Sequence, residues 1–166
     1  MNDWIIIANP TAGHGRCGRA LSGMMEELRR RGITSDVVHT RSHGDGFRCA
    51  QEVTHLGYRN IIVAGGDGTV NEVVNGLAST NRMEEFTLAT LPLGTGNSFL
   101  RDFDMQDIDS AIAKITETTV APLCDVFRCA ICLNGTCVEH WAFNNVVVGF
   151  GANVGDLMNR RLKPLG

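Results

Sequence analysis

The sequence has no long apolar run and no excess of charge of either sign. Its longest early apolar segment, Trp4–Ala8, is far too short to span a bilayer and has no basic leader before it. Fifteen Lys and Arg against eighteen Asp and Glu give a net charge of -3, and the one basic cluster, residues 29–31, ends an expected helix, where cations suit the dipole. We therefore expect a cytoplasmic protein that neither spans a membrane nor binds nucleic acid.

Paired zinc knuckles are also lacking, although the chain has six cysteines. Only Cys129 and Cys132 have the Cys-x-x-Cys spacing, and in an alternating strand residues three apart face opposite sides. This disfavours a structural zinc site built from the four neighbouring thiols, Cys124, Cys129, Cys132 and Cys137. Asn134-Gly135 indicates a two-residue hairpin turn that places Cys132 across from Cys137, so a disulfide can form there under oxidation.

The sequence shows neither a nucleophile elbow nor histidines spaced for a metal or a catalytic triad. Its five histidines are dispersed, and Ser98 follows residues 94–97, Gly-Thr-Gly-Asn, which is not the Gly-x-Ser-x-Gly pattern. The loop 13–18 has the Gly-x-Gly-x-x-Gly spacing of dinucleotide-binding turns, but His39 and Thr40 stand where a ribose-binding acid is expected. NAD binding of that kind is disfavoured and is kept as an alternative.

An apolar strand running into a glycine-dense turn, in residues 61–72, is the most informative feature of the chain. Gly65, Gly66 and Gly68 leave no Cβ in the way, so backbone N–H groups can close on a phosphate chain. Helical spacing of the next apolar residues, Val70, Val73, Val74 and Leu77, puts the turn at a helix N-terminus, which favours anions. The same spacing argues against the alternative, an Asp-Gly hairpin. Asp67 would repel phosphate unless a magnesium ion links the two.

Strands and helices alternate along most of the chain. We expect strands at residues 4–8, 33–39, 60–64 and 86–91. Apolar stripes predict helices around residues 20–28, 47–56, 70–77 and 108–115. This alternation predicts an α/β fold, a three-layer Rossmann-like nucleotide-binding domain with a mostly parallel sheet, over residues 1–120. Ligands of such sheets bind at the carboxyl ends of the strands, where we expect the loops 9–16, 65–69 and 92–101.

The pattern changes after residue 120. Residues 121–133 and 136–148 indicate long strands joined by the turn at 134–135, with no helix between them. Because a lone hairpin is only marginally stable, we expect residues 121–166 to be the start of an antiparallel β-rich second domain that is truncated at Gly166. Residues 154–165 have the spacing of a helix whose apolar face would pack on the missing part of that domain.

Three motifs, Asn9-Pro10-Thr11-Ala12-Gly13, residues 65–72 and residues 91–97, resemble in order and spacing the diacylglycerol kinase catalytic-domain family, which includes bacterial lipid kinases and the sphingosine and ceramide kinases. The resemblance implies ATP with Mg²⁺ as cofactor and transfer of the γ-phosphoryl group to a lipid hydroxyl, of diacylglycerol or a sphingoid base, at a membrane surface. NAD kinase has a similar Gly-Gly-Asp-Gly turn and is the nearest enzymatic alternative. A non-catalytic nucleotide-binding module is another, and a homo-oligomer is left open.

The same resemblance implies the site residues. Nucleotide contacts are expected from Asn9, Pro10, Thr11, Ala12, Gly13, Thr40, Gly65, Gly66, Asp67, Gly68, Thr69, Val70, Asn71 and Thr95. Asp67 and Asp125 are expected in the magnesium network. Ser98 stands where many relatives have an aspartate. The family's general base is expected beyond Gly166, so we predict no catalytic residue within this chain, and nucleotide binding with weak or absent phosphoryl transfer.

Overall fold

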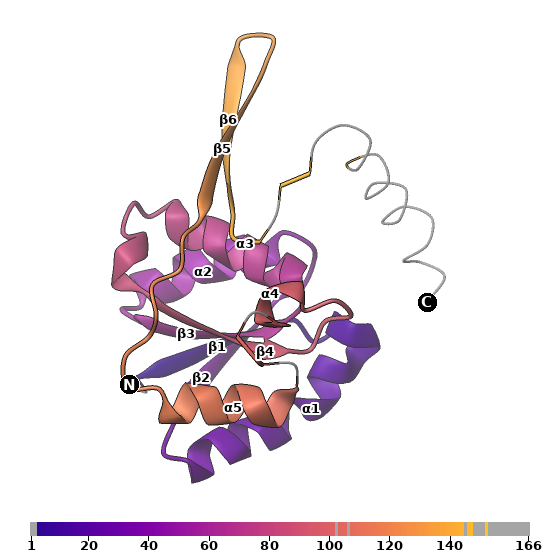
Figure 1. Ribbon diagram of the computed structural model, residues 1–166, viewed down its shortest axis with the longest axis vertical. Helices are drawn as coiled ribbons and strands as arrows, with labels where there is room; N and C mark the ends of the chain where they lie inside the picture. Colours follow the sequence, from indigo (N-terminus) through magenta and orange to yellow (C-terminus); the bar gives the residue numbers. More distant parts are fainter. Residues whose placement is uncertain (1–2, 102, 106, 145, 148–151, 153–166) are drawn as a thin grey trace.

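The structure of the protein is a computed structural model that describes residues 3–101, 103–105, 107–144, 146–147 and 152 (Figure 1). In these residues four strands form one sheet and two strands form a second. Within the described ranges, the helices are too short or too polar to cross a bilayer.

The larger sheet is parallel and has the order β2-β1-β3-β4. Its strands are β1 (Trp4–Ala8), β2 (Ser35–His39), β3 (Asn60–Gly65) and β4 (Thr87–Pro92). In the register, Ile6 of β1 lies opposite Val37 on one side and Ile62 on the other. All four predicted strands are confirmed, with ends that differ from the expected ones by at most two residues.

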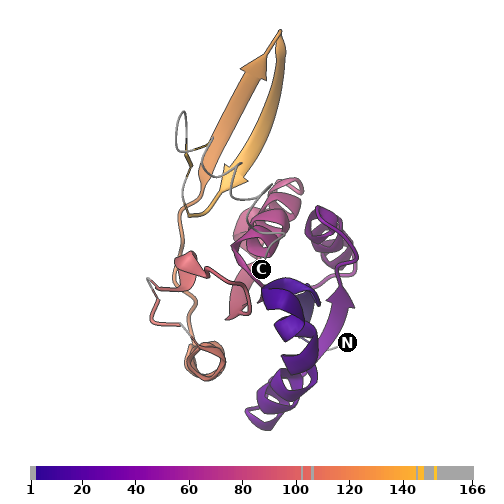
Figure 2. The ribbon, with the colours of Figure 1, turned by 90° about the vertical axis from the view of Figure 1, so that its right-hand side faces the viewer.

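Helices cover both faces of this sheet (Figure 2). α1 (Ala12–Arg30) and α5 (Ile108–Glu117) lie on one face, and α2 (Asp45–His55) and α3 (Asp67–Ala78) on the other. Successive strand residues point to opposite faces, so Ile6 is buried in the core under α1 and α5, and Ile7 in the core under α2 and α3. The predicted three-layer α/β architecture is therefore confirmed.

Two short elements lie where no regular structure was expected. α4 (Ser98–Arg101) is a single helical turn inside the predicted loop 92–101, and a 3-10 turn, η1 (Met83–Glu85), precedes β4. The helix predicted in 154–165 lies outside the described residues.

β5 (Phe127–Leu133) and β6 (Thr136–Ala142) form an antiparallel hairpin that projects from the α/β unit (Figure 1). Asn134 and Gly135 make its turn, and both have positive φ, as a two-residue turn of this kind requires. Cys132 lies opposite Cys137, and the two form a disulfide. The predicted hairpin, its turn and its cysteine pairing are confirmed.

The hairpin strands are shorter than the predicted 121–133 and 136–148. Pairing stops at Phe127 opposite Ala142, and residues 121–126 form no strand. The far end of the second predicted strand lies partly outside the described residues.

Packing at the base of the hairpin explains why the pairing stops. Ala142 and Phe143 turn into the α/β unit and are only 7% and 8% exposed. The Phe143 ring stands edge-on to Phe99 of α4, with the ring centroids 4.8 Å apart. Pro122, ahead of β5, has no N–H to donate to a ladder. Strand pairing therefore ends at Ala142, because the chain turns there and buries Ala142 and Phe143 against the α/β unit.

Candidate functional site

Loops that follow all four strands of the parallel sheet meet at its carboxyl edge and border two adjoining pockets of about 370 Å³ each. The first, which we name the turn pocket, is lined by residues of loop 9–13, segment 40–43 and the glycine turn, together with Glu72 and Gly94. The second, the third-loop pocket, is lined by residues 13–16 and 94–97, apart from Gly15. Gly13 and Gly94 line both. The topology thus brings together the loops that the sequence placed at this edge.

Nine of the fourteen predicted nucleotide-binding residues line these pockets. In the turn pocket they are Asn9, Thr11, Ala12, Gly13, Thr40, Gly66, Gly68 and Thr69. Thr95 lines the third-loop pocket. The other five, Pro10, Gly65, Asp67, Val70 and Asn71, line neither. Val70 is buried in the core, and the Asn71 side chain donates to the Trp141 carbonyl at the base of the hairpin.

The backbones of the loops come so close that only glycine fits. A Cβ on Gly94 would lie 2.4 Å from the Cα of Gly66. Gly13 has a φ of +58°, and a Cβ there would lie 2.3 Å from the carbonyl oxygen of Leu93. Gly65 accepts hydrogen bonds from the N–H groups of Leu93 and Gly94, each at 3.1 Å. Main-chain contacts therefore hold the three loops together.

The N-terminus of α3 opens on the turn pocket. Gly66 is its N-cap residue and, with no side chain, provides no cap. Thr69 and Val70 donate their N–H groups back to the Gly66 carbonyl, at 2.9 and 3.1 Å. A Cβ on Gly68 would meet no heavy atom within 4 Å, so the space beside this helix end is open. An uncapped helix N-terminus bordering open space favours a phosphate group.

Asn9 connects the first loop to the glycine turn. Its Oδ1 accepts from the N–H of Thr11 at 3.1 Å and from the Thr11 hydroxyl at 2.8 Å. Its Nδ2 donates to the Thr69 hydroxyl at 3.1 Å. One amide therefore sets the positions of two pocket-lining hydroxyl groups. The Thr69 hydroxyl accepts from Asn9 and can donate its own O–H to a phosphate oxygen, whereas the Thr11 O–H is already donated to Asn9.

Asp67 connects the glycine turn to the third loop. Its Oδ2 accepts from both the backbone N–H and the hydroxyl of Ser98, each at 3.1 Å. At the position where the family resemblance implies an aspartate, this chain therefore has a donor to Asp67 and not a second carboxylate. The same oxygen would lie 3.1 Å from a Cβ on the pocket-lining Gly96, so Asp67 lies next to the third-loop pocket without lining it.

The two predicted metal ligands lie in different surroundings. Asp125 is exposed in the segment ahead of β5, whereas Asp67 is half-buried between the two loops. Among the residues that the structure describes, no three His, Cys, Asp or Glu side chains form a metal-binding group. Magnesium bound to a nucleotide needs only one or two protein carboxylates, because phosphate and water oxygens complete its shell. Asp67 fits that requirement.

Arg16 is a site residue that the sequence analysis missed. Its Nη2 donates to the carbonyl oxygens of Pro92 and Gly94, each at 3.2 Å, and its side chain lines the third-loop pocket. The guanidinium therefore holds the third loop on α1 and adds positive charge beside the expected phosphates. Its place in the first glycine-rich loop was the one signal available in the sequence.

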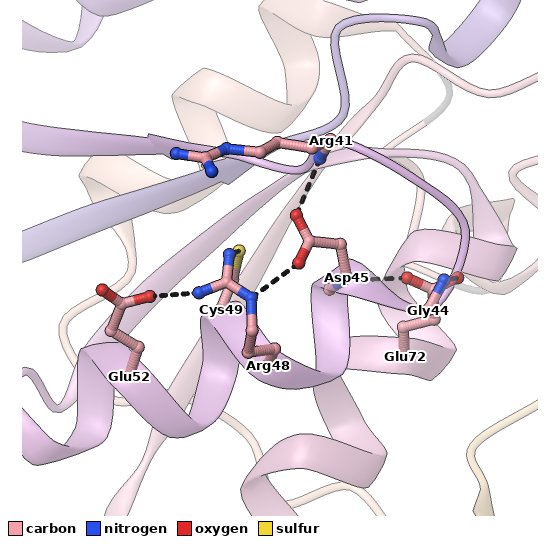
Figure 3. A network of polar contacts seen from close by, with 8 residues as sticks. Arg41, Gly44, Asp45, Arg48, Cys49, Glu52 and Glu72 are labelled. Carbon is pink, nitrogen blue, oxygen red and sulfur yellow. Dashed lines mark hydrogen bonds and ion pairs between the residues drawn. The ribbon is translucent and has the colours of Figure 1, made fainter.

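The segment between β2 and α2 forms another wall of the turn pocket, and Asp45 organises it (Figure 3). The Arg41 N–H donates to Asp45 Oδ2 at 2.8 Å, and Arg48 Nε donates to Oδ1 at 2.8 Å. The hydrogen bond from Arg48, followed by that from the Arg41 N–H, lowers the pKa of the Asp45 carboxyl. Glu72 approaches this segment from α3 and also lines the pocket. Neither carboxylate was among the predicted site residues.

Comparison with known proteins gives a family match over most of the chain. The model of the diacylglycerol kinase catalytic domain matches residues 3–128. The chain is 36% identical over 115 residues to a diacylglycerol kinase of Bacillus subtilis (strain 168), covering 69% of this chain and 37% of that protein. It is 37% identical over 113 residues to a diacylglycerol kinase of Staphylococcus aureus, covering 68% of this chain and 35% of that protein. The chain thus spans little more than a third of the length of these relatives.

Solved structures agree with the family match. The crystal structure of a diacylglycerol kinase from Bacillus anthracis str. Sterne superposes with a TM-score of 0.62 at 27% sequence identity. The superposition covers 86% of this chain and 62% of that one.

Proposed function

Because this chain belongs to the diacylglycerol kinase catalytic-domain family, we propose that it is the nucleotide-binding part of an ATP-dependent lipid kinase. In this proposal residues 1–120 bind ATP with Mg²⁺, and residues 121–166 begin a β-rich second domain. The γ-phosphoryl group passes to a hydroxyl of diacylglycerol or a sphingoid base, at the surface of a membrane that the cytoplasmic protein contacts peripherally. The observation that carries the proposal is the meeting of three backbone loops beside the open N-terminus of α3.

The phosphates would lie where the glycine turn faces the third loop. There the N–H groups at the start of α3 and the hydroxyls of Thr69 and Thr95 supply donors, and Arg16 supplies a positive charge. The turn pocket extends from Gly94 to segment 40–43, which follows β2. β2 lies two strands from β3, roughly 10 Å along the sheet edge, and this separation suits a nucleotide whose nucleoside points toward segment 40–43.

Asp67 would hold the metal through its carboxylate, with Ser98 fixing the side chain by two hydrogen bonds. Bound Mg²⁺ supplies neutralisation of the charge on the transferred phosphoryl group. Asn9, Gly13 and Gly66 position the surrounding loops. Binding and orientation are therefore the contributions of these residues to phosphoryl transfer.

We assign the general base to a part of the protein outside this chain. Loss of a positioned general base lowers a rate by roughly 100-fold to 10,000-fold. The chain alone should therefore bind Mg-ATP and transfer phosphate slowly.

Calorimetric titration of the chain with Mg-ATP tests the site. We expect saturable binding that Asp67→Asn weakens and that Asp109→Asn, an exposed carboxylate on α5, leaves unchanged. Absence of binding by the unmutated chain would refute the nucleotide site, and equal loss in both variants would refute the role of Asp67.

Radiolabelled ATP with vesicles containing diacylglycerol or sphingosine tests the reaction. Weak labelling of lipid, increased when the protein extends beyond Gly166, supports the lipid kinase. Labelling of NAD and not of lipid would favour a NAD kinase-like enzyme. Nucleotide binding without transfer by the longer protein would favour a non-catalytic nucleotide-binding module.

A further inference from the structure

Phe143 directly follows β6 and carries the end of the hairpin into the core of the α/β unit. Its side chain is 8% exposed and belongs to the core cluster that includes Val70 and Val73 of α3. Its ring also meets the ring of Phe99 on α4, with an angle of 88° between the planes and 4.8 Å between the centroids. A perpendicular pair of this kind attracts beyond the area that it buries. Phe143 therefore connects the hairpin with both α3 and α4.

α4 is held in place mainly by its apolar side chains. It is a single turn, Ser98–Arg101, and a helix this short is not stable by itself because nucleation is costly. Leu100 is 5% exposed, and the half-buried Phe99 contacts Phe103 as well as Phe143, with 5.1 Å between the Phe99 and Phe103 centroids. Loss of the Phe143 ring should accordingly let α4 shift.

The first residue of α4 holds the carboxylate of Asp67. Ser98 donates its N–H and its hydroxyl to Asp67 Oδ2, each at 3.1 Å. Ser98 is exposed, so water competes for both hydrogen bonds whenever α4 moves. Within the described ranges no hydrogen bond reaches Asp67 Oδ1, which leaves that oxygen for a metal ion. Because Ser98 and Phe99 are consecutive, the packing of the Phe99 ring sets the position of both donors.

The end of the hairpin contacts the other partner of this pair as well. Asp67 is the first residue of α3, and Asn71 on the same helix donates to the Trp141 carbonyl at 3.3 Å. Trp141 lies two residues before Phe143, where the base of the hairpin lies over α3 (Figure 1). The end of β6 therefore fixes both elements that the hydrogen bonds between Asp67 and Ser98 join.

We propose that Phe143 is a positioning residue for the metal-binding carboxylate of Asp67, and that it acts through Phe99 and Ser98. The inference rests on the proposed nucleotide function. Phe143 lines neither pocket, so it touches neither nucleotide nor metal. Loss of its ring should therefore weaken the contribution of Mg²⁺ to nucleotide binding and spare the contacts that metal-free ATP makes. In this way the hairpin segment supports the metal site of the α/β unit.

Calorimetric titration with ATP, once with Mg²⁺ and once with EDTA, separates these contributions. Phe143→Leu keeps an apolar side chain and removes the ring. We expect the Kd of Mg-ATP to rise about threefold to tenfold, the range that an aromatic pair contributes, with the Kd of metal-free ATP within about twofold of the unmutated value. Phe86→Leu is the matched control, since Phe86 packs against the same core at the opposite edge of the sheet, ahead of β4. It should change neither Kd.

The route of action is tested by a double variant. In the Asp67→Asn background, Phe143→Leu should cause no further loss of Mg-ATP affinity, because the carboxylate that it positions is gone. A further loss in that background would show that Phe143 acts by another route, and the positioning role would be wrong.

Hydrogen exchange in the nucleotide-free protein gives a readout that does not depend on binding. The Ser98 amide should exchange faster in Phe143→Leu, while the amides of β3 keep their protection. Unchanged exchange at Ser98 would overturn the proposal, and so would a general loss of protection that includes β3.

A second variant guards against a folding defect. Phe99→Leu removes the same ring pair from its half-buried side, so it should give the same pattern as Phe143→Leu. Unchanged Mg-ATP binding in Phe99→Leu, or equal weakening of Mg-ATP and metal-free ATP, would overturn the inference and leave the nucleotide site standing. If the unmutated chain binds no Mg-ATP, the proposed function fails and this inference fails with it.

Discussion

The side chain of Asn75 binds both main-chain groups of Trp141. Its Nδ2 donates to the Trp141 carbonyl at 2.8 Å, and its Oδ1 accepts from the Trp141 N–H at 2.8 Å. The side-chain amide thus makes the two hydrogen bonds to β6 that the main chain of a neighbouring strand would make. Because Asn75 lies on α3, the hairpin is fastened to the helix that begins at the glycine turn (Figure 1).

Asn71, one turn earlier on α3, contributes to the same attachment. Its Nδ2 donates to the Trp141 carbonyl at 3.3 Å, and its Oδ1 lies 3.0 Å from Nε2 of His140. Asn71 was predicted to contact the nucleotide. Such a contact would have to use its main chain, or its side chain would have to leave the hairpin.

Asn75→Ala should loosen the hairpin from α3. The variant leaves the Trp141 N–H without its acceptor and removes the shorter of the two hydrogen bonds to the Trp141 carbonyl, while the one from Asn71 at 3.3 Å remains. We therefore expect the free energy of unfolding to fall by about 1–3 kcal/mol, the net value of two hydrogen bonds. Urea denaturation measures this loss, and hydrogen exchange at the Trp141 amide should accelerate. Asn75→Asp separates the two hydrogen bonds, because a carboxylate still accepts from the Trp141 N–H while its second oxygen repels the Trp141 carbonyl. Protection of the Trp141 amide should then persist although stability falls. An unchanged exchange rate at Trp141 in Asn75→Ala would contradict the attachment.

Alanine at two glycines of the turn pocket should change stability in opposite directions and weaken nucleotide binding in both cases. Gly94→Ala places a Cβ 2.4 Å from Gly66 Cα, so we expect lower stability together with at least about tenfold weaker Mg-ATP binding. At Gly68 a Cβ meets no heavy atom within 4 Å, and alanine is preferred over glycine in a helix by up to about 1 kcal/mol. Gly68→Ala should therefore fold as well as or better than the unmutated chain, yet bind Mg-ATP more weakly because the methyl group enters the pocket. Thermal unfolding and calorimetry measure both effects. Full nucleotide affinity in Gly68→Ala would place the phosphates elsewhere.

The elements of the α/β unit could be predicted because each has a local pattern. Trp4–Ala8 is a continuous apolar run, and Val70, Val73 and Leu77 have helical spacing. The meeting of the loops at one edge then follows from the parallel direction of the strands. Asn134-Gly135 is also a local pattern, and this two-residue turn was enough to predict the register of the hairpin.

Long-range side-chain contacts could not be predicted from such patterns. Arg16 reaches a carbonyl 76 positions away, Glu72 an N–H 28 positions away and Asn75 a carbonyl 66 positions away. These partners are main-chain groups, which every residue carries, so the sequence does not mark them. The early end of β6 could not be predicted either, because it depends on a long-range contact between the rings of Phe143 and Phe99.

Acidification should disorder the wall of the turn pocket at the start of α2. The pKa of Asp45 is lowered in the folded protein by its hydrogen bonds from Arg48 and the Arg41 N–H. Its stabilising contribution is therefore complete above the unfolded value, roughly 4, and is lost as the pH falls through the lower folded value. We expect the Arg41 amide to lose protection only below about pH 4, with the network intact at neutral pH.

An NMR titration of the Asp45 carboxyl carbon and the Arg41 amide tests this order of events. Asp45→Asn is the control, because an amide does not titrate and the acid-dependent change at the Arg41 amide should disappear. An Asp45 carboxyl that titrates at or above its unfolded value would contradict the network.

Reduction of the Cys132–Cys137 disulfide should leave nucleotide binding unchanged. The bridge closes a loop with a sequence separation of 5 beside the turn, at the end of the hairpin away from the α/β unit (Figure 1). A loop this short is stabilised by about 2 kcal/mol in the chain-entropy model, and that contribution concerns the hairpin itself. The hairpin is attached to α3 by hydrogen bonds between the Asn75 side chain and the main chain of Trp141, and the disulfide takes no part in them.

We therefore expect the Kd of Mg-ATP to agree within about twofold between oxidised protein, protein treated with reductant and the double variant Cys132→Ser with Cys137→Ser. Calorimetry under the three conditions measures it. The double variant serves as the control for effects of the reductant on the other thiols, of which Cys17 and Cys49 are buried and Cys124 is exposed. A weaker affinity in both the reduced protein and the double variant would mean that the hairpin tip influences α3, and that the attachment at Trp141 transmits the change to the glycine turn.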